Sequence, residues 1–106
     1  MDYAQKLAQA VALFRLAAAQ GLDGAQHSLG LRYFHGNEVA RDYAEALRWF
    51  HLAAAQGYPH AFYLIADCHE NGRGVAADEA EAIRWYRCAQ AAGNPNAAVD
   101  LQGLCV

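Results

Sequence analysis

Five histidines are the residues of this sequence with the broadest chemical potential, because imidazole serves both metal binding and proton transfer. They are His27, His35, His51, His60 and His69. No two of them stand four residues apart and no HExxH arrangement is present, so the spacing does not favour a zinc hydrolase. His35 could meet Glu70 or Asn71 across neighbouring helices, but a zinc site needs three or four converging ligands. The sequence therefore predicts no metal site and no cofactor.

Two glutamates recur at matched positions, each three residues after an aspartate. Glu45 follows Asp42 and Glu81 follows Asp78. This spacing is typical of a capping box at a helix start, and it does not indicate a pair of catalytic carboxylates. No Ser/His/Asp or Cys/His spacing stands out as a nucleophilic site. We therefore expect no enzyme, and hydrolase-like activity is a remote alternative without a visible site.

Three cysteines, Cys68, Cys88 and Cys105, show no CxxC spacing. The interpretation we favour treats them as small, semi-buried apolar residues on helices. The alternative pairs Cys68 with Cys105, which stand nearly in register on neighbouring repeats, although disulfide geometry tolerates little mismatch. Free cysteines fit a reducing compartment, so we expect a cytoplasmic protein. A periplasmic or secreted location stays open if the chain is a piece of a longer protein.

Composition narrows the range of partners. The 106 residues are 56% hydrophobic, enough for one continuous core. Eight basic residues stand against 11 acidic ones, for a net charge of -3, and no basic run occurs that would bind a phosphate backbone. Apolar residues never run to the roughly 18 needed to span a bilayer. We therefore expect no nucleic acid and no membrane among the partners.

The elements that must position these residues repeat along the chain. The segment from Asp42 to Gly57 matches the segment from Asp78 to Gly93 after a shift of 36 positions. A fixed period of this size is typical of stacked helical repeats. Apolar residues recur at steps of three and four and no stretch alternates like a strand. The predicted fold is all-α, a right-handed α-solenoid of antiparallel helix pairs with a 36-residue repeat.

Helix-ending residues divide this single domain into units. The units are 1–21 (second helix of a partial repeat), 22–57 and 58–93 (complete repeats), and 94–106 (first helix of a partial repeat). Asp23 and Gln26 have capping-box spacing, and Pro59 suits the first position of a helix. Gly36 and Gly72 are expected to end the first helices in the left-handed conformation.

A known repeat motif matches these residues. Its matching positions are Ala25, Leu29, Gly30, Tyr33, Gly36, Val39, Asp42, Ala46, Trp49, Phe50, Ala53, Ala54, Gln56 and Gly57. The pattern resembles the Sel1-like repeat, a relative of the tetratricopeptide repeat. Glu38, His69 and Ala66 depart from it, standing at the positions of a loop glycine, a tyrosine and a glycine. The resemblance implies an adaptor that assembles protein complexes in signalling, protein quality control or bacterial interaction with hosts or envelopes.

The first helix of each repeat is expected to line the concave surface of a solenoid. Removing the packing residues leaves the following candidates for contact with a partner: His27, Ser28, Leu31, Phe34 and His35; His60, Tyr63, Leu64, Asp67, Glu70 and Asn71; and Asn96, Val99 and Asp100. Aromatic, hydrogen-bonding and acidic groups together suit a protein segment or peptide, extended or helical, that bears a basic side chain. The plain alternative is an ordinary solvated face on which Phe34 is partly covered.

Self-association is the second hypothesis. The first and last helices lack a partner helix, and each is expected to expose apolar residues that a neighbouring repeat would cover. These residues are Leu7, Val11 and Phe14 in the first helix and Val99, Leu101 and Leu104 in the last. We expect either a homodimer through these terminal helices or a fragment of a longer repeat array.

Overall fold

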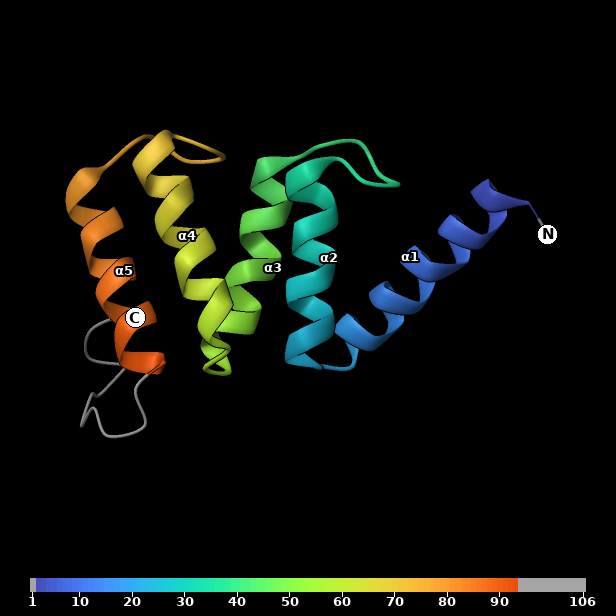
Figure 1. Cartoon of the computed structure of the whole chain (residues 1–106), viewed down its shortest axis with the longest axis horizontal. Coiled ribbons are helices and arrows are strands. Elements are labelled where there is room, and N and C mark those ends of the chain that lie inside the picture. Colours follow the sequence, from blue (N-terminus) through green and yellow to red (C-terminus); the bar gives the residue numbers. More distant parts are fainter. Residues whose placement is uncertain (1, 94–106) are drawn as a thin grey trace.

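The computed structural model describes residues 2–93, which form a row of helices (Figure 1). They are α1 (Tyr3–Ala19), α2 (Asp23–His35), α3 (Tyr43–Ala55), α4 (Pro59–Asn71) and α5 (Glu79–Ala92). Helices α2 to α5 stand side by side and successive helices run in opposite directions, while α1 is inclined at one end of the row. The predicted all-helical solenoid is confirmed. The helix predicted for 94–106 lies outside the described residues.

The helices are arranged as two closely packed pairs. Helix α2 packs most extensively on α3, and α4 on α5, whereas the contacts of α1 with α2 and of α3 with α4 are smaller. Helix α4 begins 36 positions after α2, at residue 59 against 23, and α5 follows α3 by the same interval. Within residues 2–93, no helix combines the length and the apolar character needed to cross a bilayer.

Aspartates are the N-cap residues of three of the described helices, α1, α3 and α5. Asp42 accepts a hydrogen bond from the Glu45 amide (3.0 Å) and Asp78 accepts one from the Glu81 amide (3.1 Å). These contacts satisfy amides that have no partner within the helix. The predicted reciprocal contact from each glutamate is not made, because both glutamate side chains turn to arginines one turn later. A complete capping box forms instead in α1, between Asp2 and Gln5.

The capping box predicted for Asp23 and Gln26 is wrong. Asp23 is already the first residue of α2, and the residue before it, Leu22, makes no side-chain cap. Gln26 is buried, where its amide donates to the Ala18 carbonyl (3.2 Å) and accepts from Gln56 (2.8 Å). The Gln26 side chain therefore joins the ends of α1 and α3 and is not available to cap α2.

Two glycine caps and one proline follow the sequence prediction. Gly36 (φ 72°) and Gly72 (φ 68°) end α2 and α4 in the left-handed conformation, and Pro59 occupies the first turn of α4. Glu38 takes a positive φ of 64° at the loop position where the second repeat has Gly74. The Glu38 carboxylate forms an ion pair with Arg32, which holds the loop against α2.

The main core lies between α3, α4 and α5. Its buried members are Ala46, Leu47, Phe50, Ala53, Ala54, Ala61, Phe62, Ile65, Ala66, Cys68, Trp85, Cys88 and Ala89. Of the two adjacent aromatic residues of α3 that match the repeat motif, Phe50 is fully buried and Trp49 is half-buried. Alanines therefore allow the helix axes to approach, and a few large rings fill the remaining space.

A smaller core fastens α1 to α2. It contains Val11, Ala18 and Leu29, with Phe14 packed beside them. The prediction that Val11 and Phe14 expose an apolar end face is therefore wrong, because α2 covers them. The side chain of Leu7 and residues Val99, Leu101 and Leu104 are outside the described part. The large apolar residues of α1 that do lie open are Tyr3, Leu13 and Leu16.

The cysteines differ from one another. Cys68 is a fully buried free thiol, so the alternative that paired it with Cys105 is wrong. Burial raises the pKa of the Cys68 thiol to about 11. Cys88 is also fully buried but is disulfide-bonded, contrary to the expectation of three free cysteines. Cys105 lies outside the described residues.

The crossing of α2 over α3 depends on a residue without a side chain. A Cβ atom added to Gly30 would lie 2.6 Å from Cε1 of Phe50 and 3.2 Å from the carbonyl oxygen of Ala46. Both distances are shorter than normal contacts, and Phe50 is fully enclosed and cannot move aside. The backbone of α2 therefore approaches α3 as closely as only glycine allows.

We predict that Gly30→Ala lowers the free energy of unfolding by about 1–3 kcal/mol, because the new methyl group overpacks the crossing. Gly24→Ala is the matched control, since it lies in the same helix with no atom within 4 Å of the added Cβ. Because alanine has a higher helix propensity than glycine, Gly24→Ala should leave the free energy of unfolding unchanged or raise it by up to about 1 kcal/mol. Urea unfolding followed by circular dichroism measures both, and equal stability of the two variants would contradict the packing argument.

Candidate interaction surface

The predicted contact residues of α4 share its least buried side. His60, Tyr63, Glu70 and Asn71 are exposed, while Leu64 and Asp67 are half-buried. The opposite side of the helix is buried in the core through Ala61, Phe62, Ile65, Ala66 and Cys68. This division follows from the helical period of 3.6 residues. The structure therefore brings the predicted residues of α4 together on one outward surface.

The corresponding side of α2 is less open. Of its predicted residues only His35 is exposed, and His27, Ser28, Leu31 and Phe34 are half-buried. The Phe34 ring lies 5.3 Å from the ring of Tyr43 and 6.0 Å from that of Phe50, between ring centroids. Phe34 thus has the packing role that the alternative interpretation gave it. Asn96, Val99 and Asp100 lie outside the described residues.

A row of rings connects the helices on this side of the molecule. Its members, called the ring row here, are His27, Tyr58, His60, Tyr63 and Tyr86. The centroid distances are 4.8 Å between His27 and Tyr58, 5.6 Å between His27 and His60, 6.4 Å between His60 and Tyr63, and 6.3 Å between Tyr63 and Tyr86. These distances suit favourable contacts between tilted rings. The ring row therefore extends from α2 across α4 to α5.

Two members of the ring row were missed by the sequence prediction. Tyr58 precedes α4 and Tyr86 belongs to α5, and neither is part of a first helix. The internal repeat carried the signal for Tyr86, because this residue stands 36 positions after Phe50 and Tyr63 stands 36 after His27. The two equivalent ring contacts have similar lengths, 6.1 Å for His27 and Phe50 against 6.3 Å for Tyr63 and Tyr86.

The two acids of α4 have different electrostatic environments. Asp67 forms an ion pair with Arg73 (2.6 Å) and accepts a hydrogen bond from the Asn71 amide (2.8 Å), so its charge is balanced. Glu70 accepts a hydrogen bond from the hydroxyl of Tyr86. This bond, together with burial, raises the pKa of Tyr86 to about 12. Glu70 is itself exposed at the edge of the ring row.

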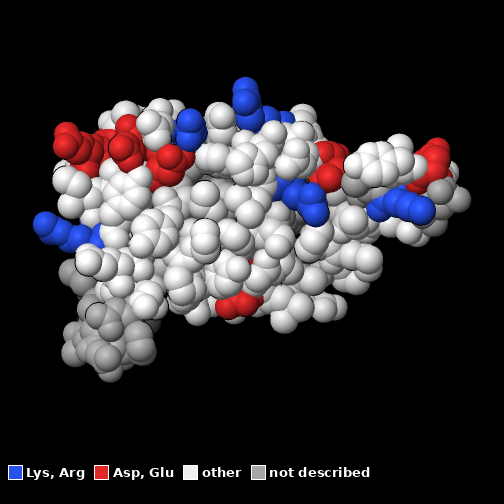
Figure 2. Space-filling view, viewed as in Figure 1, with Lys and Arg blue, Asp and Glu red and all other residues white. Residues whose placement is uncertain are grey.

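Charged side chains are unevenly distributed on the face shown in Figure 2. Acidic side chains gather at the corner where α5 begins, while the centre of the face carries few charges. The first turn of α5 contributes Glu79 and Glu81 after the capping Asp78. Negative charge near the positive end of a helix is favourable, which explains its accumulation there.

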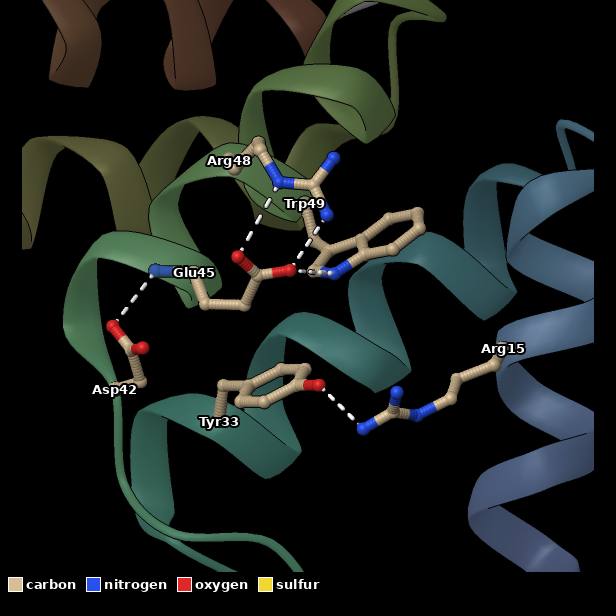
Figure 3. A network of polar contacts seen from close by, with 6 residues as sticks. All are labelled: Arg15, Tyr33, Asp42, Glu45, Arg48 and Trp49. Atoms are coloured by element: carbon tan, nitrogen blue, oxygen red, sulfur yellow. Dashed lines mark hydrogen bonds and ion pairs between the residues drawn. The ribbon is translucent and has the colours of Figure 1, made fainter.

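A second polar network holds the other end of the molecule together (Figure 3). Arg15 of α1 donates a hydrogen bond to the hydroxyl of Tyr33 on α2 (2.6 Å). Glu45 accepts hydrogen bonds from Arg48 (2.6 Å) and from Nε1 of Trp49 (3.2 Å). The hydrogen bond from Arg48 is the main cause that lowers the pKa of Glu45. This carboxylate is therefore engaged as an ion and has a structural role.

The described residues contain no cluster of three or more His, Cys, Asp or Glu side chains that could hold a metal ion.

A row of antiparallel helix pairs with a repeated core defines the class of helical-repeat solenoids. The family model of the Sel1 repeat matches residues 4–22, 24–58 and 59–94. The chain therefore belongs to the Sel1 repeat family, whose members are generally scaffolds for protein interaction.

Two solved structures are similar to this chain. One is c5321, a protective antigen present in uropathogenic Escherichia coli strains that displays an SLR fold, with 42% identity over 88% of this chain and a TM-score of 0.78. The other is a Sel1 repeat protein from Oxalobacter formigenes, with 42% identity over 83% and a TM-score of 0.77. The chain covers 19% and 25% of their respective lengths. No curated protein matches the sequence significantly.

We predict that Tyr86→Phe lowers the free energy of unfolding by about 1 kcal/mol, because it removes the hydrogen bond to Glu70 and keeps the ring. A phenylalanine ring should fit at position 86, since the first repeat has Phe50 at the equivalent position. Tyr63→Phe is the control, because the more exposed Tyr63 hydroxyl is open to water, and it should change stability by less than about 0.5 kcal/mol. Equal effects of the two changes in urea unfolding would show that the Tyr86 bond contributes nothing.

Proposed function

We propose that this chain is a non-catalytic adaptor that binds a peptide or protein segment on the surface formed by α4 and the ring row. The observation that carries the proposal is the exposure of Tyr63, which is 49% accessible and lies between His60 and Tyr86 in that row. Tyrosine is enriched where proteins bind one another, because its rigid ring offers a large contact area and a hydroxyl. The scaffold role typical of the family supports this assignment.

The chemistry of the surface favours a segment that carries both an apolar and a basic side chain. Tyr63 and His60 offer rings for the apolar group. Glu70 lies near the other end of α4 from His60, where its exposed carboxylate accepts a hydrogen bond from Tyr86, and further acidic side chains stand where α5 begins (Figure 2). Charge complementarity of this kind orients a partner and speeds its association. We therefore assign a Lys or Arg of the partner to the Glu70 end of the surface.

Selection from a random peptide library, followed by calorimetry with the best peptide, tests this function. Selected peptides should be rich in Lys or Arg next to aromatic or aliphatic residues. Tyr63→Ala should weaken their binding about tenfold or more, as truncation of a central contact does. Leu52→Ala is the matched control, because Leu52 is similarly exposed (42%) but lies on α3.

Two outcomes would oppose the assignment. Equal affinity of the wild type and Tyr63→Ala for every selected peptide would exclude the surface, and a loss caused by Leu52→Ala would relocate it to α3. Phe34→Ala is unsuitable for this test because Phe34 packs against the core, so its truncation lowers stability as well.

Self-association is a second candidate function, favoured by the open side of α1. Leu13 and Leu16 are 67% and 58% exposed. The residues 72 positions later, Trp85 and Cys88, are 9% and 0% exposed because neighbouring helices cover them. A shallow groove beside Leu13, formed with Gly24, Ala25 and Ser28 of α2, is lined mainly by small side chains. We propose that a second copy of the chain can cover this side of α1.

Sedimentation velocity over a range of concentrations tests self-association. The wild type should form a dimer that dissociates on dilution, and Leu13→Gln combined with Leu16→Gln should remain monomeric, because the change removes apolar area that association would bury. Both side chains are exposed, so the variant should fold as stably as the wild type. A wild type that sediments as a monomer at every concentration would exclude this candidate.

A further inference from the structure

Four of the five histidines form two interacting pairs where the second helix pair packs on the first. His27 of α2 lies beside His60 of α4, with ring centroids 5.6 Å apart. His51 of α3 is influenced by the charge of His69 on α4. His60 and His69 stand near opposite ends of α4 (Pro59–Asn71). Each end of α4 therefore carries a histidine that interacts with a histidine of the preceding pair, His60 through ring contact and His69 through its charge.

The surroundings of His27 offer no group that would stabilise a positive charge on its ring. The His27 ring is surrounded by the rings of Phe50 (6.1 Å), Tyr58 (4.8 Å) and His60. Its Nε2 atom is buried and has no hydrogen-bond partner among the described residues. A neutral imidazole tolerates this environment, but a protonated ring would bury an N–H group without an acceptor. Burial, and then the charge of His60, lower the pKa of His27.

The second pair interacts through charge, and His51 remains exposed to solvent although its ring packs on Trp85. The His51 ring stands edge-on to Trp85 of α5 at a centroid distance of 5.3 Å, with His69 as the charged neighbour. The Nδ1 atom of His69 is buried without a hydrogen-bond partner in the described part of the chain. Burial, and then the charge of His69, lower the pKa of His51. Within residues 2–93, none of the four histidines forms an ion pair with a carboxylate.

We propose that these two histidine pairs make the packing of α4 on the first helix pair sensitive to acid, stable while the rings are neutral and weakened when they take up protons. The ionisable groups that act on the rings are Tyr58 and His60 at His27, and His69 at His51. In weak acid each pair carries like charges that repel, and at the half-buried His27 ring Tyr58 supplies no negative charge.

The direction of the pH effect follows from the lowered pKa values. A histidine of the unfolded chain titrates near 6.5, and His27 and His51 titrate below that value in the folded protein. Between the two values the unfolded chain binds more protons, so stability rises with pH. The stabilisation is complete above about pH 6.5 and is lost as the pH falls below it.

Urea unfolding of the full chain between about pH 7.5 and pH 5.5 tests the inference, in a range above the titration of ordinary carboxyl groups. In the lower part of this range, each unit by which the pH falls should increase the unfolding equilibrium constant of the wild type by up to about tenfold for each shifted histidine. Combining His27→Tyr with His51→Gln should remove most of this dependence. His27→Tyr introduces the residue that the second repeat has at this position, Tyr63.

The matched control is His35→Asn, which exchanges an exposed histidine for the residue at the same position of the second repeat, Asn71. It should keep the pH dependence of the wild type. A double variant with the same pH dependence as the wild type would overturn the proposal, as would a control that loses it.

Titration of the imidazole C–H signals by NMR decides the matter if the double variant does not fold. The exposed His60→Gln should raise the pKa of His27 and leave that of His51 unchanged. His69→Tyr, which restores the residue found at Tyr33, should raise the pKa of His51 alone. If neither change moves the pKa of its neighbour, the histidines are not coupled and the proposal fails.

Discussion

The close approach of α2 to α3 at Gly30 is the contact on which the rest of the structure depends. Because no side chain separates the α2 backbone from Phe50, that ring is fully enclosed and fixes the first helix pair. The second pair has Ala66 at the glycine position and Tyr86 at the position of Phe50. The Tyr86 ring is half-buried, with its hydroxyl on Glu70. The same repeat position therefore holds a fully enclosed ring in one repeat and a partly open ring in the next.

The features that the sequence predicted correctly are those decided by near neighbours in the chain. The caps at Asp42 and Asp78, Pro59 in the first turn and the left-handed Gly36 each depend on a few consecutive residues. Gln26 failed as a cap because its partners, Ala18 and Gln56, belong to two other helices. Capping-box spacing is only a local signal, and it cannot register a competing partner that lies 30 residues away.

The candidate surface shows the same limit. Helical periodicity was sufficient to place Tyr63, Glu70 and His60 on the outer side of α4, where their contacts with α2 and α5 within residues 2–93 leave them exposed. It was insufficient for α2, where Arg73 from the loop after α4 lies over Phe34, 5.6 Å from the ring centroid. The hydrophobic pattern of a helix predicts which side faces the core. It does not predict which residues of the outer side the next repeat buries, because that depends on tertiary packing.

His60 connects the proposed binding surface with the histidine contacts, because its ring lies beside both Tyr63 and His27. A partner that packs an apolar or basic group on Tyr63 must also desolvate or approach His60. Such a partner binds the neutral ring better than the charged one, since it offers the charge no compensation. Thermodynamic linkage then requires that acid weaken the partner's binding by the same factor by which the partner opposes protonation. The proposed binding surface and the proposed acid-sensitive packing are therefore linked through one side chain, His60.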